Sequence, residues 1–540
     1  MDDSRDVKAS RVTGTRERMQ QTINIRKEKR LANWRKRHAR QGSPEAKQGQ
    51  AGYQQQQQHG IPSINGAPGT PPPLPYAGAG AAADIDIAYL DHYAYGVRHG
   101  NEEEQLKCTR KIRKLLSKED NPPAMEIIQK GLVPNLVHFL TFVNNTKLQF
   151  EAAWALTNIA STEHTKYVTV DRPPLMRNAV PLLARLMKSP NPDVREQSCW
   201  CLGNVAGDGH VLRNIVLSTP FCLKNLILNI VHAHNASMLK NATWALSNFC
   251  RGKPQPAIHV IQPALIILSR LLHCINDEVL RDACWAFSYV SDGDDSRIEA
   301  VLKVEPLQRL VALLAHEKSS VVTPALRSLG NIISGNDAQT QRALNAGAMQ
   351  ALIPLLGHER ANIQKEACWT LSNIAAGTPQ QARSLVHAVD NVGHSVMSRV
   401  ITLANGGNYD VRKEAAWVLA NICTGSDPNN IRVLVDATPT SAITALCNLL
   451  TMEDLRMLHV GLEALEAILS KGHPQPGQSF EAMIDMAGGV DHIERLCDHR
   501  DEDLYLKATG IYDRWFTTNG GDDEESDDDI RADAFGPHPN

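Results

Sequence analysis

The sequence has little cysteine, few aromatic residues and no long apolar run. Its 11 cysteines are spread over 540 residues, and no two of them are spaced as Cys-x-x-Cys. This pattern disfavours a disulfide scaffold, a zinc ribbon and a thioredoxin-like redox centre. We therefore expect reduced thiols and an intracellular protein.

The sequence also offers no membrane span and no secretory signal. A helical span takes about 18 or more consecutive apolar residues. The best candidate, residues 258–272, is interrupted by His259, Gln262 and Pro263. The N-terminus is charged from Asp2 onward, unlike a signal peptide. With 42% hydrophobic and 21% charged residues, the composition is that of a soluble globular protein.

Motifs that would indicate catalysis are missing too. The histidines show no His-Glu-x-x-His spacing, and neither a phosphate-binding Gly-x-x-x-x-Gly-Lys-Ser/Thr loop nor a Gly-x-Ser-x-Gly elbow occurs. The acidic run 292–295 lacks the spacing of a calcium loop, and a turn that ends a helix explains it better. We therefore expect a protein that is not an enzyme and holds no metal or cofactor.

The net charge of −3 hides a strong asymmetry along the chain. Residues 1–40 carry 13 Lys/Arg and 5 Asp/Glu, whereas residues 41–83 are rich in Gln, Pro, Gly and Ala, as in a flexible linker. Residues 522–533 carry eight acids and one arginine, which predicts a disordered acidic tail. The middle, residues 84–521, has a net charge of −4, so it should attract the basic arm.

A short pattern, Trp-x-Leu-x-Asn, returns five times in the middle of the chain. Its copies begin at Trp154, Trp200, Trp244, Trp369 and Trp417. Weaker copies fill the gaps at Trp285 with Tyr289, at Arg327 with Asn331, and at Glu463. The copies are 41 to 48 residues apart, which is the period of three-helix solenoid repeats of the armadillo or HEAT kind.

Local sequence agrees with three helices per repeat. Gly131 and Gly347 predict the turn from a short first helix to an apolar second helix, and the polar segment 191–195 predicts the start of a third helix. A glycine about four residues past the Asn position predicts a left-handed cap where the third helix ends, at Gly293, Gly335, Gly377 and Gly425. We predict an all-α fold, a right-handed superhelical solenoid of about ten three-helix armadillo repeats.

The Trp and Asn positions lie on a different helix face from the packing residues. In the first copy, Leu156 and Ile159 belong to the packing stripe, with Ala152 and Ala155, while Trp154 and Asn158 are four residues apart on another face. Stacked repeats would align these pairs as an exposed ladder on the inner surface. The competing interpretation is that buried Trp and Asn only stabilise the helices.

Such a ladder would bind an extended basic peptide. An Asn amide can pair with both the N–H and the C=O of a ligand backbone, whatever the ligand's sequence. Indole faces suit Lys and Arg side chains, with about 0.5 to 2 kcal/mol per good contact. Nearby acids could supply charge-assisted hydrogen bonds to the same cations, at Asp208, Glu278, Asp282, Asp292 and Glu414.

At these residues the chain resembles importin-α, the armadillo-repeat adaptor of nuclear import, over nearly its whole length. The resemblance extends to Ala-Gly-Asp-Gly at 206–209, to the segments 285–293 and 326–332, and to the terminal unit 488–516. Even the Tyr in place of Asn and the Arg in place of Trp in the central copies match the family. The turn at 161–165 is a departure, since the family has a longer Ser-Gly turn there.

The resemblance implies two sites for nuclear localisation signals, which together would accept a bipartite signal. The major site would comprise Trp154, Asn158, Ser161, Thr165, Gln197, Trp200, Asn204, Asp208, Trp244 and Asn248, with Asp208 taking the key lysine. The minor site would comprise Glu278, Asp292, Arg327, Asn331, Trp369, Asn373, Glu414, Trp417 and Asn421.

The resemblance also assigns the ends of the chain. Residues 1–60, with a core at 11–40, would bind importin-β, and free of importin-β they would occupy the major site as a mimic of cargo. The basic residues concerned are Arg26, Lys27, Lys29, Arg30, Arg35, Lys36 and Arg37. The linker 41–83 has an r.m.s. span of roughly 35 to 40 Å, which is long enough for these basic residues to reach the major site. The solenoid 84–516 would end in a repeat that contacts the export receptor with Ran-GTP, followed by the acidic tail 517–540.

The implied function is that of a non-enzymatic adaptor that shuttles between cytoplasm and nucleus. One alternative is a general armadillo scaffold for signalling or adhesion partners, which would have a basic groove and is disfavoured by the acidic middle region. A basic arm taken alone would suit nucleic acid, but its pairing with an acidic, Trp-bearing solenoid favours a peptide ligand. An enzyme with a helical-repeat domain would need a second domain, for which no residues remain.

Overall fold

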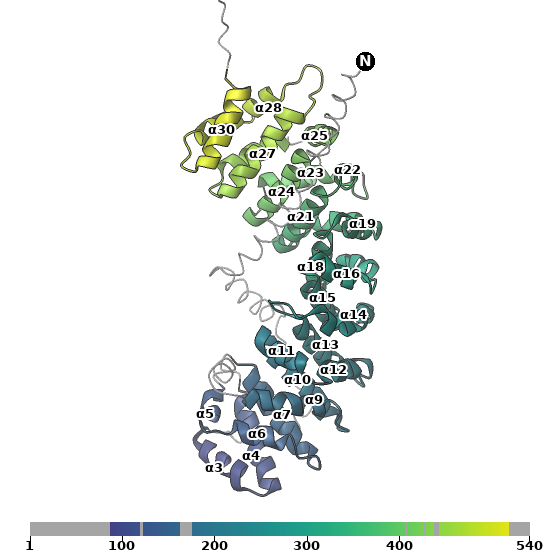
Figure 1. Cartoon of the computed structure of the whole chain (residues 1–540), viewed down its shortest axis with the longest axis vertical. Coiled ribbons are helices and arrows are strands. Elements are labelled where there is room, and N and C mark those ends of the chain that lie inside the picture. Colours follow the sequence, from purple (N-terminus) through teal and green to yellow (C-terminus); the bar gives the residue numbers. More distant parts are fainter. Residues whose placement is uncertain are drawn as a thin grey trace, which may run out of the picture. The chain divides into compact units, whose positions relative to one another are not determined.

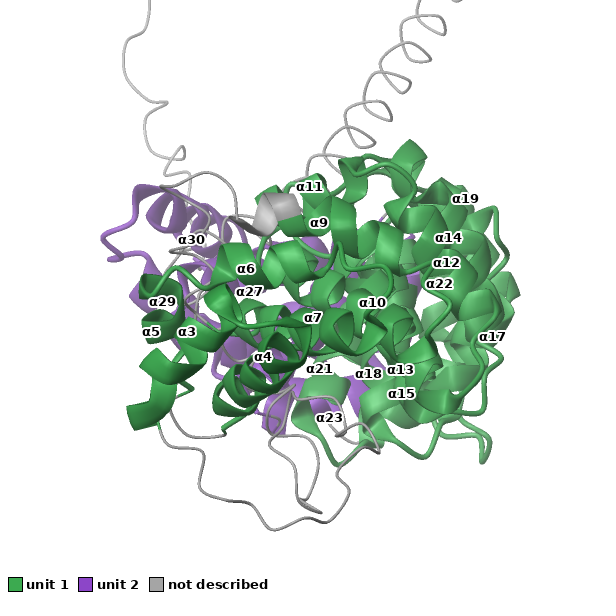
Figure 2. Ribbon diagram, turned by 90° about the horizontal axis from the view of Figure 1, so that it is seen from below, with its two compact units in different colours: residues 1–394 green, residues 395–540 purple. Residues whose placement is uncertain are grey.

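The computed structural model describes residues 87–118, 122–162, 175–406, 408–425, 427–436 and 442–517. All its elements in these ranges are helices, which confirms the all-α prediction. The basic arm, the linker, the acidic tail and Thr165 lie outside the described residues. The chain divides into two compact units at His394, drawn in different colours in Figure 2.

The long third helices form the centre of each unit. In the first unit they are α4 (Glu102–Leu116), α7 (Thr146–Ala160), α10 (Pro192–Gly207), α13 (Ala236–Cys250), α15 (Asp277–Ser291), α18 (Ser319–Ile333) and α21 (Ala361–Ala375). In the second they are α24 (Tyr409–Thr424), α27 (Leu455–Lys471) and α30 (Glu502–Trp515). Within each unit, every third helix packs on the next in chain order, as Figure 1 shows for α7 to α18.

Shorter helices cover this central row. The second helices are α6 (Val133–Phe139), α9 (Leu175–Leu186), α12 (Cys222–Val231), α14 (Ile258–Leu271), α17 (Leu307–Ala312) with η2 (Leu313–Ala315), α20 (Ala348–Leu352) with η3 (Ile353–Gly357), α23 (Val396–Gly406), α26 (Ala442–Cys447) with η4 (Asn448–Thr451), and α29 (Gly489–Leu496). The first helices are α5 (Ala124–Gln129), α11 (His210–Ser218), α16 (Asp295–Leu302), α19 (Asp337–Asn345), α22 (Pro379–Val386), α25 (Pro428–Val435) and α28 (Phe480–Met486). The described chain opens with η1 (Ile87–Tyr89) and α3 (Leu90–His99).

The third helices begin at asparagine caps and are fixed by small apolar side chains. The side-chain oxygens of Asn145, Asn191 and Asn235 accept backbone N–H groups in the first turns of α7, α10 and α13, which satisfies donors that have no partner within the helix. On α7 the predicted packing stripe is confirmed, because Ala152, Ala155, Leu156 and Ile159 are all 0% exposed. These small side chains let neighbouring helices approach closely.

One repeat departs from the three-helix prediction. Residues 251–257, between α13 and α14, form no helix. They contain Gly252, Pro254 and Pro256, which disfavour helix, and their carbonyl groups are bound by buried arginines. Arg213 donates to the carbonyls of Arg251 (2.6 Å), Gly252 (3.0 Å) and Pro254 (2.6 Å), so the irregular segment keeps its backbone hydrogen bonds.

The prediction of left-handed glycine caps at the ends of third helices is wrong. None of the four glycines has a positive φ, whereas Gly131 (64°) and Gly347 (91°) do so at the turn from first to second helix and Gly252 (93°) does so two residues after α13. Gly335 has another role, because a Cβ there would collide with the Oε1 of Gln339. Gln339 is the capping-box residue of α19, and it also donates to the carbonyl of Asp295 in the preceding repeat (2.9 Å). The glycine therefore leaves room for a cap.

No single helix among the described residues has the length and apolar composition to cross a membrane.

The capping glutamine provides a stability test. Gln339→Ala should lower the free energy of unfolding by about 1 to 3 kcal/mol, because the carbonyl of Asp295 and the N-terminus of α19 both lose a partner. Urea unfolding followed by circular dichroism measures this change. The control is Gln350→Ala on the exposed face of α20, which should change stability by less than about 0.5 kcal/mol. Equal effects would contradict the assigned role.

Candidate functional site

The Trp and Asn pairs lie on consecutive third helices, but they are less exposed than predicted. The side chains of Trp154 and Trp244 are half-buried, and Trp200 and Trp369 are only 7% and 8% exposed. The predicted exposed ladder is therefore partly wrong. The physical reason is that each pair also packs on the preceding third helix.

The asparagine amides tie each third helix to the one before it. The Nδ2 of Asn204 donates to the carbonyl of Thr157 (3.1 Å), that of Asn248 to the carbonyl of Gly203 (3.1 Å), and that of Asn331 to the carbonyl of Ser288 (2.9 Å). The competing interpretation is thus correct in part, because the ladder asparagines stabilise the contact between successive third helices. An amide has two N–H donors and a carbonyl oxygen, so each Asn keeps hydrogen-bonding capacity for a ligand.

Two glycines leave the space in which an indole ring of the next third helix packs. A Cβ added at Gly203 on α10 would lie 2.6 Å from Cζ3 of Trp244 on α13. At Gly330 on α18 an added Cβ would collide in the same way with the ring of Trp369 on α21. Sequence reasoning missed both glycines. The signal was present in the Gly-Asn dipeptides of these copies, where the glycine precedes the ladder asparagine.

Arginines of the protein itself occupy two of the indole faces. The guanidinium of Arg113 on α4 lies 4.1 Å from the ring centroid of Trp154, and Arg113 also pairs with Glu151 (2.8 Å). Arg327 lies 5.7 Å from the ring centroid of Trp369 and pairs with Glu366. The ladder rings therefore accept a cation held by a carboxylate. The sequence had assigned Arg327 a place in the middle of the ladder but had not singled out Arg113 or Glu366.

The remaining residues of the predicted major site differ in accessibility. Gln197 is 0% exposed and its Nε2 donates to the Oγ1 of Thr157 (2.7 Å), so it supports the helix contact and does not line a surface. Asp208 is half-buried as the C-cap residue of α10. Ser161 is exposed at the end of α7, and its hydroxyl donates to the carbonyl of Asn158 (2.8 Å).

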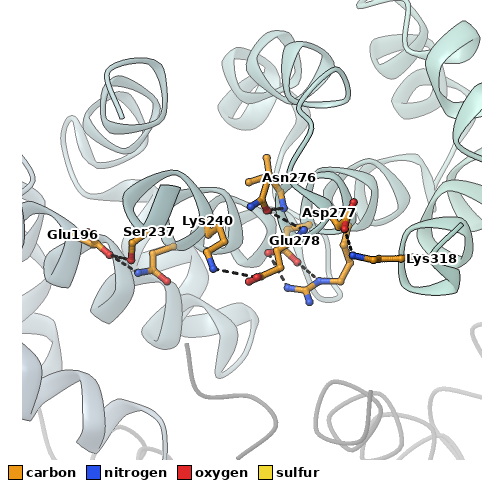
Figure 3. A network of polar contacts seen from close by, with 11 residues as sticks. Glu196, Ser237, Lys240, Asn276, Asp277, Glu278 and Lys318 are labelled. Atoms are coloured by element: carbon orange, nitrogen blue, oxygen red, sulfur yellow. Dashed lines mark hydrogen bonds and ion pairs between the residues drawn. The ribbon is translucent and has the colours of Figure 1, made fainter. Parts of the chain in front are cut away.

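Two of the predicted acids, Glu278 on α15 and Asp292 directly after it, are already paired within the first unit. Figure 3 shows Glu278 directed at Lys240, with 3.1 Å between the carboxylate and the Nζ atom. Because Lys240 lies on α13, this places Glu278 beside the helix of Trp244, whereas the sequence had assigned it to the minor site. Asp292 pairs with Lys253 (3.0 Å).

Asp282 on α15 is a correction to the predicted set of ligand-binding acids. It is 3% exposed and paired with Arg281 (2.9 Å). Burial raises the pKa of the Asp282 carboxyl, and Arg281 opposes that shift. Its charge is therefore directed into the protein and not at a ligand.

In the central copy of the motif, on α15, the indole ring of Trp285 is stacked against a second aromatic ring of the same helix. Trp285 and Tyr289 on α15 are stacked, with ring centroids 5.9 Å apart and planes inclined by 19°. A Tyr at the Asn position therefore replaces an amide with a ring that covers the indole. This contact lies between the pairs on α7, α10 and α13 and the pairs on the helices that follow.

The predicted minor-site residues belong to both units. In the first unit, Asn331 is buried and Asn373 has an Nδ2 atom that is buried without a hydrogen-bond partner among the described residues. In the second unit, Glu414, Trp417 and Asn421 lie on α24 and are half-buried. An unpaired buried donor is costly, so the Nδ2 of Asn373 is well suited to donate to a ligand carbonyl.

The thiols beside the ladder belong to the packing. Cys199, Cys201, Cys284 and Cys368 are buried. Burial raises the pKa of Cys201 to about 12 and also raises the pKa values of Cys199 and Cys284. These three thiols are therefore protonated at neutral pH. Within the described ranges, no three His, Cys, Asp or Glu side chains are grouped to hold a metal ion.

Comparisons with known proteins agree with the repeat architecture. An armadillo/β-catenin-like repeat family matches residues 120–161, 253–292 and 336–376, a HEAT-like repeat family matches 146–205, and an atypical armadillo repeat family matches 479–529. The crystal structure of an engineered protein superposes with a TM-score of 0.69 at 26% identity, over 78% of this chain and 98% of that chain.

Whole-length relatives decide the family. Importin subunit alpha-1b of Oryza sativa subsp. japonica is 40% identical over 80% of this chain and 78% of its own length. Importin subunit alpha-3 of Arabidopsis thaliana is 39% identical over 82% of each chain. This protein belongs to the importin-α family. The predicted resemblance is confirmed, and with it the armadillo solenoid of importin-α.

The seats for the indole rings provide a second test. Gly203→Ala and Gly330→Ala should each destabilise this importin-α by about 1 to 3 kcal/mol, because the added methyl displaces a packed ring. Differential scanning fluorimetry measures the change. The matched control is Gly510→Ala in α30, where an added Cβ meets nothing within 4 Å. It should be neutral or stabilising, and a control as damaging as the two variants would refute the ring-seat assignment.

Proposed function

We propose that the protein is a nuclear import adaptor that binds Lys/Arg-rich nuclear localisation signals as extended peptides along its Trp/Asn ladder and links them to importin-β. The observation that carries the proposal is the pair of internal arginines, Arg113 and Arg327, already held against ladder indoles. A basic peptide would make the same contact with the indoles that follow. Its relatives are named importin subunits alpha.

The major site would hold a cationic stretch over α7, α10 and α13. Asn204 and Asn248 would use their remaining amide hydrogen and their carbonyl oxygen to pair with the peptide backbone. Asn158, whose Nδ2 already donates to the Ser117 hydroxyl and the Arg113 carbonyl, would pair through its carbonyl oxygen. Lys and Arg stems would lie between successive indoles, and Asp208 at the end of α10 would bind a lysine ammonium. Selection would come from the side chains and affinity from the backbone, so many basic sequences would be accepted.

The minor site would hold the shorter cluster of a bipartite signal. In the first unit Asn331, Trp369 and Asn373 would bind this cluster, and in the second unit Glu414, Trp417 and Asn421 are the candidates for it. The unpaired Nδ2 of Asn373 would gain a backbone carbonyl from the peptide. The stacked Trp285 and Tyr289 would leave the connecting residues of the cargo without a ladder contact.

The basic arm would control access to the major site. Residues 11–40 would bind importin-β in one state and lie on the ladder in the other, with Arg35, Lys36 and Arg37 imitating a signal. Importin-β would remove this internal competitor and shift the population toward the open ladder. The terminal repeat near α28 to α30 would bind the export receptor with Ran-GTP, and the adaptor would shuttle between cytoplasm and nucleus.

Replacing the key acid tests the major site. Asp208→Lys should weaken binding of a fluorescent monopartite signal peptide by about 2 kcal/mol or more, roughly 30-fold, because a repelling charge replaces a paired one. Fluorescence polarisation measures the affinity. Asp485→Lys, an exposed site on α28, makes the same change in net charge and should leave the affinity nearly unchanged. If both variants bind like the parent protein, Asp208 has no such role.

Autoinhibition can be tested in the full chain. Substituting Arg35, Lys36 and Arg37 by alanine should raise the affinity for a signal peptide when importin-β is absent. Residues 84–540, which lack the arm, should bind the signal peptide as tightly as the substituted full chain does. The control removes three charges elsewhere in the arm, by alanine substitution of Arg5, Lys8 and Arg11. An identical gain in the control would indicate general electrostatics, and no gain in either variant would reject autoinhibition by this cluster.

A further inference from the structure

One stretch of the solenoid carries no acidic residue. Between Asp208 and Asp277 there are six Lys/Arg and five His but no Asp or Glu, although residues 84–521 as a whole are net negative. The stretch contains α11, α12, α13 and α14. Arg213 is buried and Lys240 and Lys253 pair with Glu278 and Asp292, so any unpaired charge that this stretch brings to the surface is positive.

Large apolar side chains are exposed on the second helices of this stretch. Phe221, Leu228 and Val231 are 70%, 40% and 50% exposed, and they recur at helical spacing along one face of α12. Ile266 on α14 is 52% exposed. The helices α12 and α14 are in contact and lie along the same side of the first unit (Figure 1). Together they form an apolar face, which in a monomeric protein usually marks an interaction site.

Two cations lie on the same face. Lys224 stands between Phe221 and Leu228 on α12, and Arg270 lies one turn after Ile266 on α14. Both side chains are exposed, and neither makes an ion pair with another described residue. Elsewhere in this stretch the lysines are already paired, as Lys240 is with Glu278 and Lys253 with Asp292. Lys224 and Arg270 therefore remain available to a partner.

Phe221 is held in an unusual backbone conformation. It precedes α12 with φ of 61°, in the left-handed region that a bulky side chain rarely adopts. The ring gains little from burial, because it is 70% exposed. Retaining an exposed phenyl ring at a strained position is typical of a residue that serves recognition.

We propose that the α12/α14 face, defined by Phe221, Lys224, Leu228, Val231, Ile266 and Arg270, docks an acidic amphipathic helix of another protein. The exposed apolar side chains of these two neighbouring helices can pack against the apolar anchors that a partner helix carries at i, i+3 or i+4 and i+7. Acidic residues beside those anchors would meet Lys224 and Arg270. This surface is separate from the ladder, so a partner could bind here while cargo occupies the Trp/Asn positions.

A membrane is less suited to this face than a peptide. Two cations near an anionic bilayer contribute only about 1 kcal/mol each. The apolar side chains form a narrow stripe interrupted by polar residues, such as Gln262 and His259 on α14, which are exposed. A helix needs a stripe of this width, whereas stable membrane anchoring needs a broader one.

A selection experiment on the full chain tests the proposal. A displayed library of helix-forming peptides with randomised surface positions is panned against the protein, in the presence of excess basic signal peptide to fill the ladder. We expect enrichment of acidic sequences with apolar residues at i, i+3 or i+4 and i+7. A synthetic peptide from the selection should then bind at least about tenfold more weakly to Phe221→Asn/Ile266→Gln.

The variants keep the test independent of folding. Asn tolerates the left-handed position of residue 221 and Gln is a good helix former, and an unchanged affinity for the signal peptide verifies the fold. Tyr95→Gln/Val143→Asn removes two other exposed apolar side chains and should bind the selected peptide normally. No acidic amphipathic enrichment, or binding insensitive to the Phe221 and Ile266 changes, would overturn the proposal. The proposal would also be overturned if the Phe221→Asn/Ile266→Gln variant, and not the Tyr95→Gln/Val143→Asn variant, lost binding to phosphatidylserine vesicles or lost self-association. The face would then bind a membrane or a second copy of the chain.

Discussion

The packing of each ladder pair on the preceding third helix is the constraint on which the rest of the structure depends. In the best-formed case, the ring of Trp244 lies over Gly203 and the amide of Asn248 donates to the carbonyl of that same glycine. The Trp-x-x-x-Asn spacing is therefore a joint between repeats as well as a recognition element. Repeats contact only their neighbours in a solenoid, so a joint of this kind sets the distance between successive binding pairs.

This double use explains how a surface made of ordinary side chains can be held ready for a ligand. An indole fixed against a glycine backbone loses little rotamer freedom when a peptide binds, because that freedom was already lost in folding. An amide with one hydrogen committed to the neighbouring helix has a fixed orientation for its remaining groups. The two internal arginines also have two contacts each. The guanidiniums of Arg113 and Arg327 each lie over an indole ring and pair with a carboxylate.

The sequence predicted the fold class and the positions of the ladder, because a Trp-x-x-x-Asn pattern repeated every 41 to 48 residues is a strong signal. It could not predict burial, since Gln197 and Asp282 are polar residues and yet are 0% and 3% exposed, and Gln197 is bound to Thr157 of the preceding repeat. It wrongly predicted a left-handed conformation for Gly335 after the third helix α18. The absence of a side chain at Gly335 instead leaves room for the side chain of Gln339. Sequence reasoning also missed Arg113, because the repeat pattern is weak in the helix that carries it.

The crystal structure of the protein bound to a Lys/Arg-rich peptide tests the central claim most directly. The account predicts an extended peptide whose backbone N–H and C=O groups lie within hydrogen-bonding distance of the Asn158, Asn204 and Asn248 amides, with basic stems between the indoles. A peptide bound as a helix, or bound away from those amides, would contradict it.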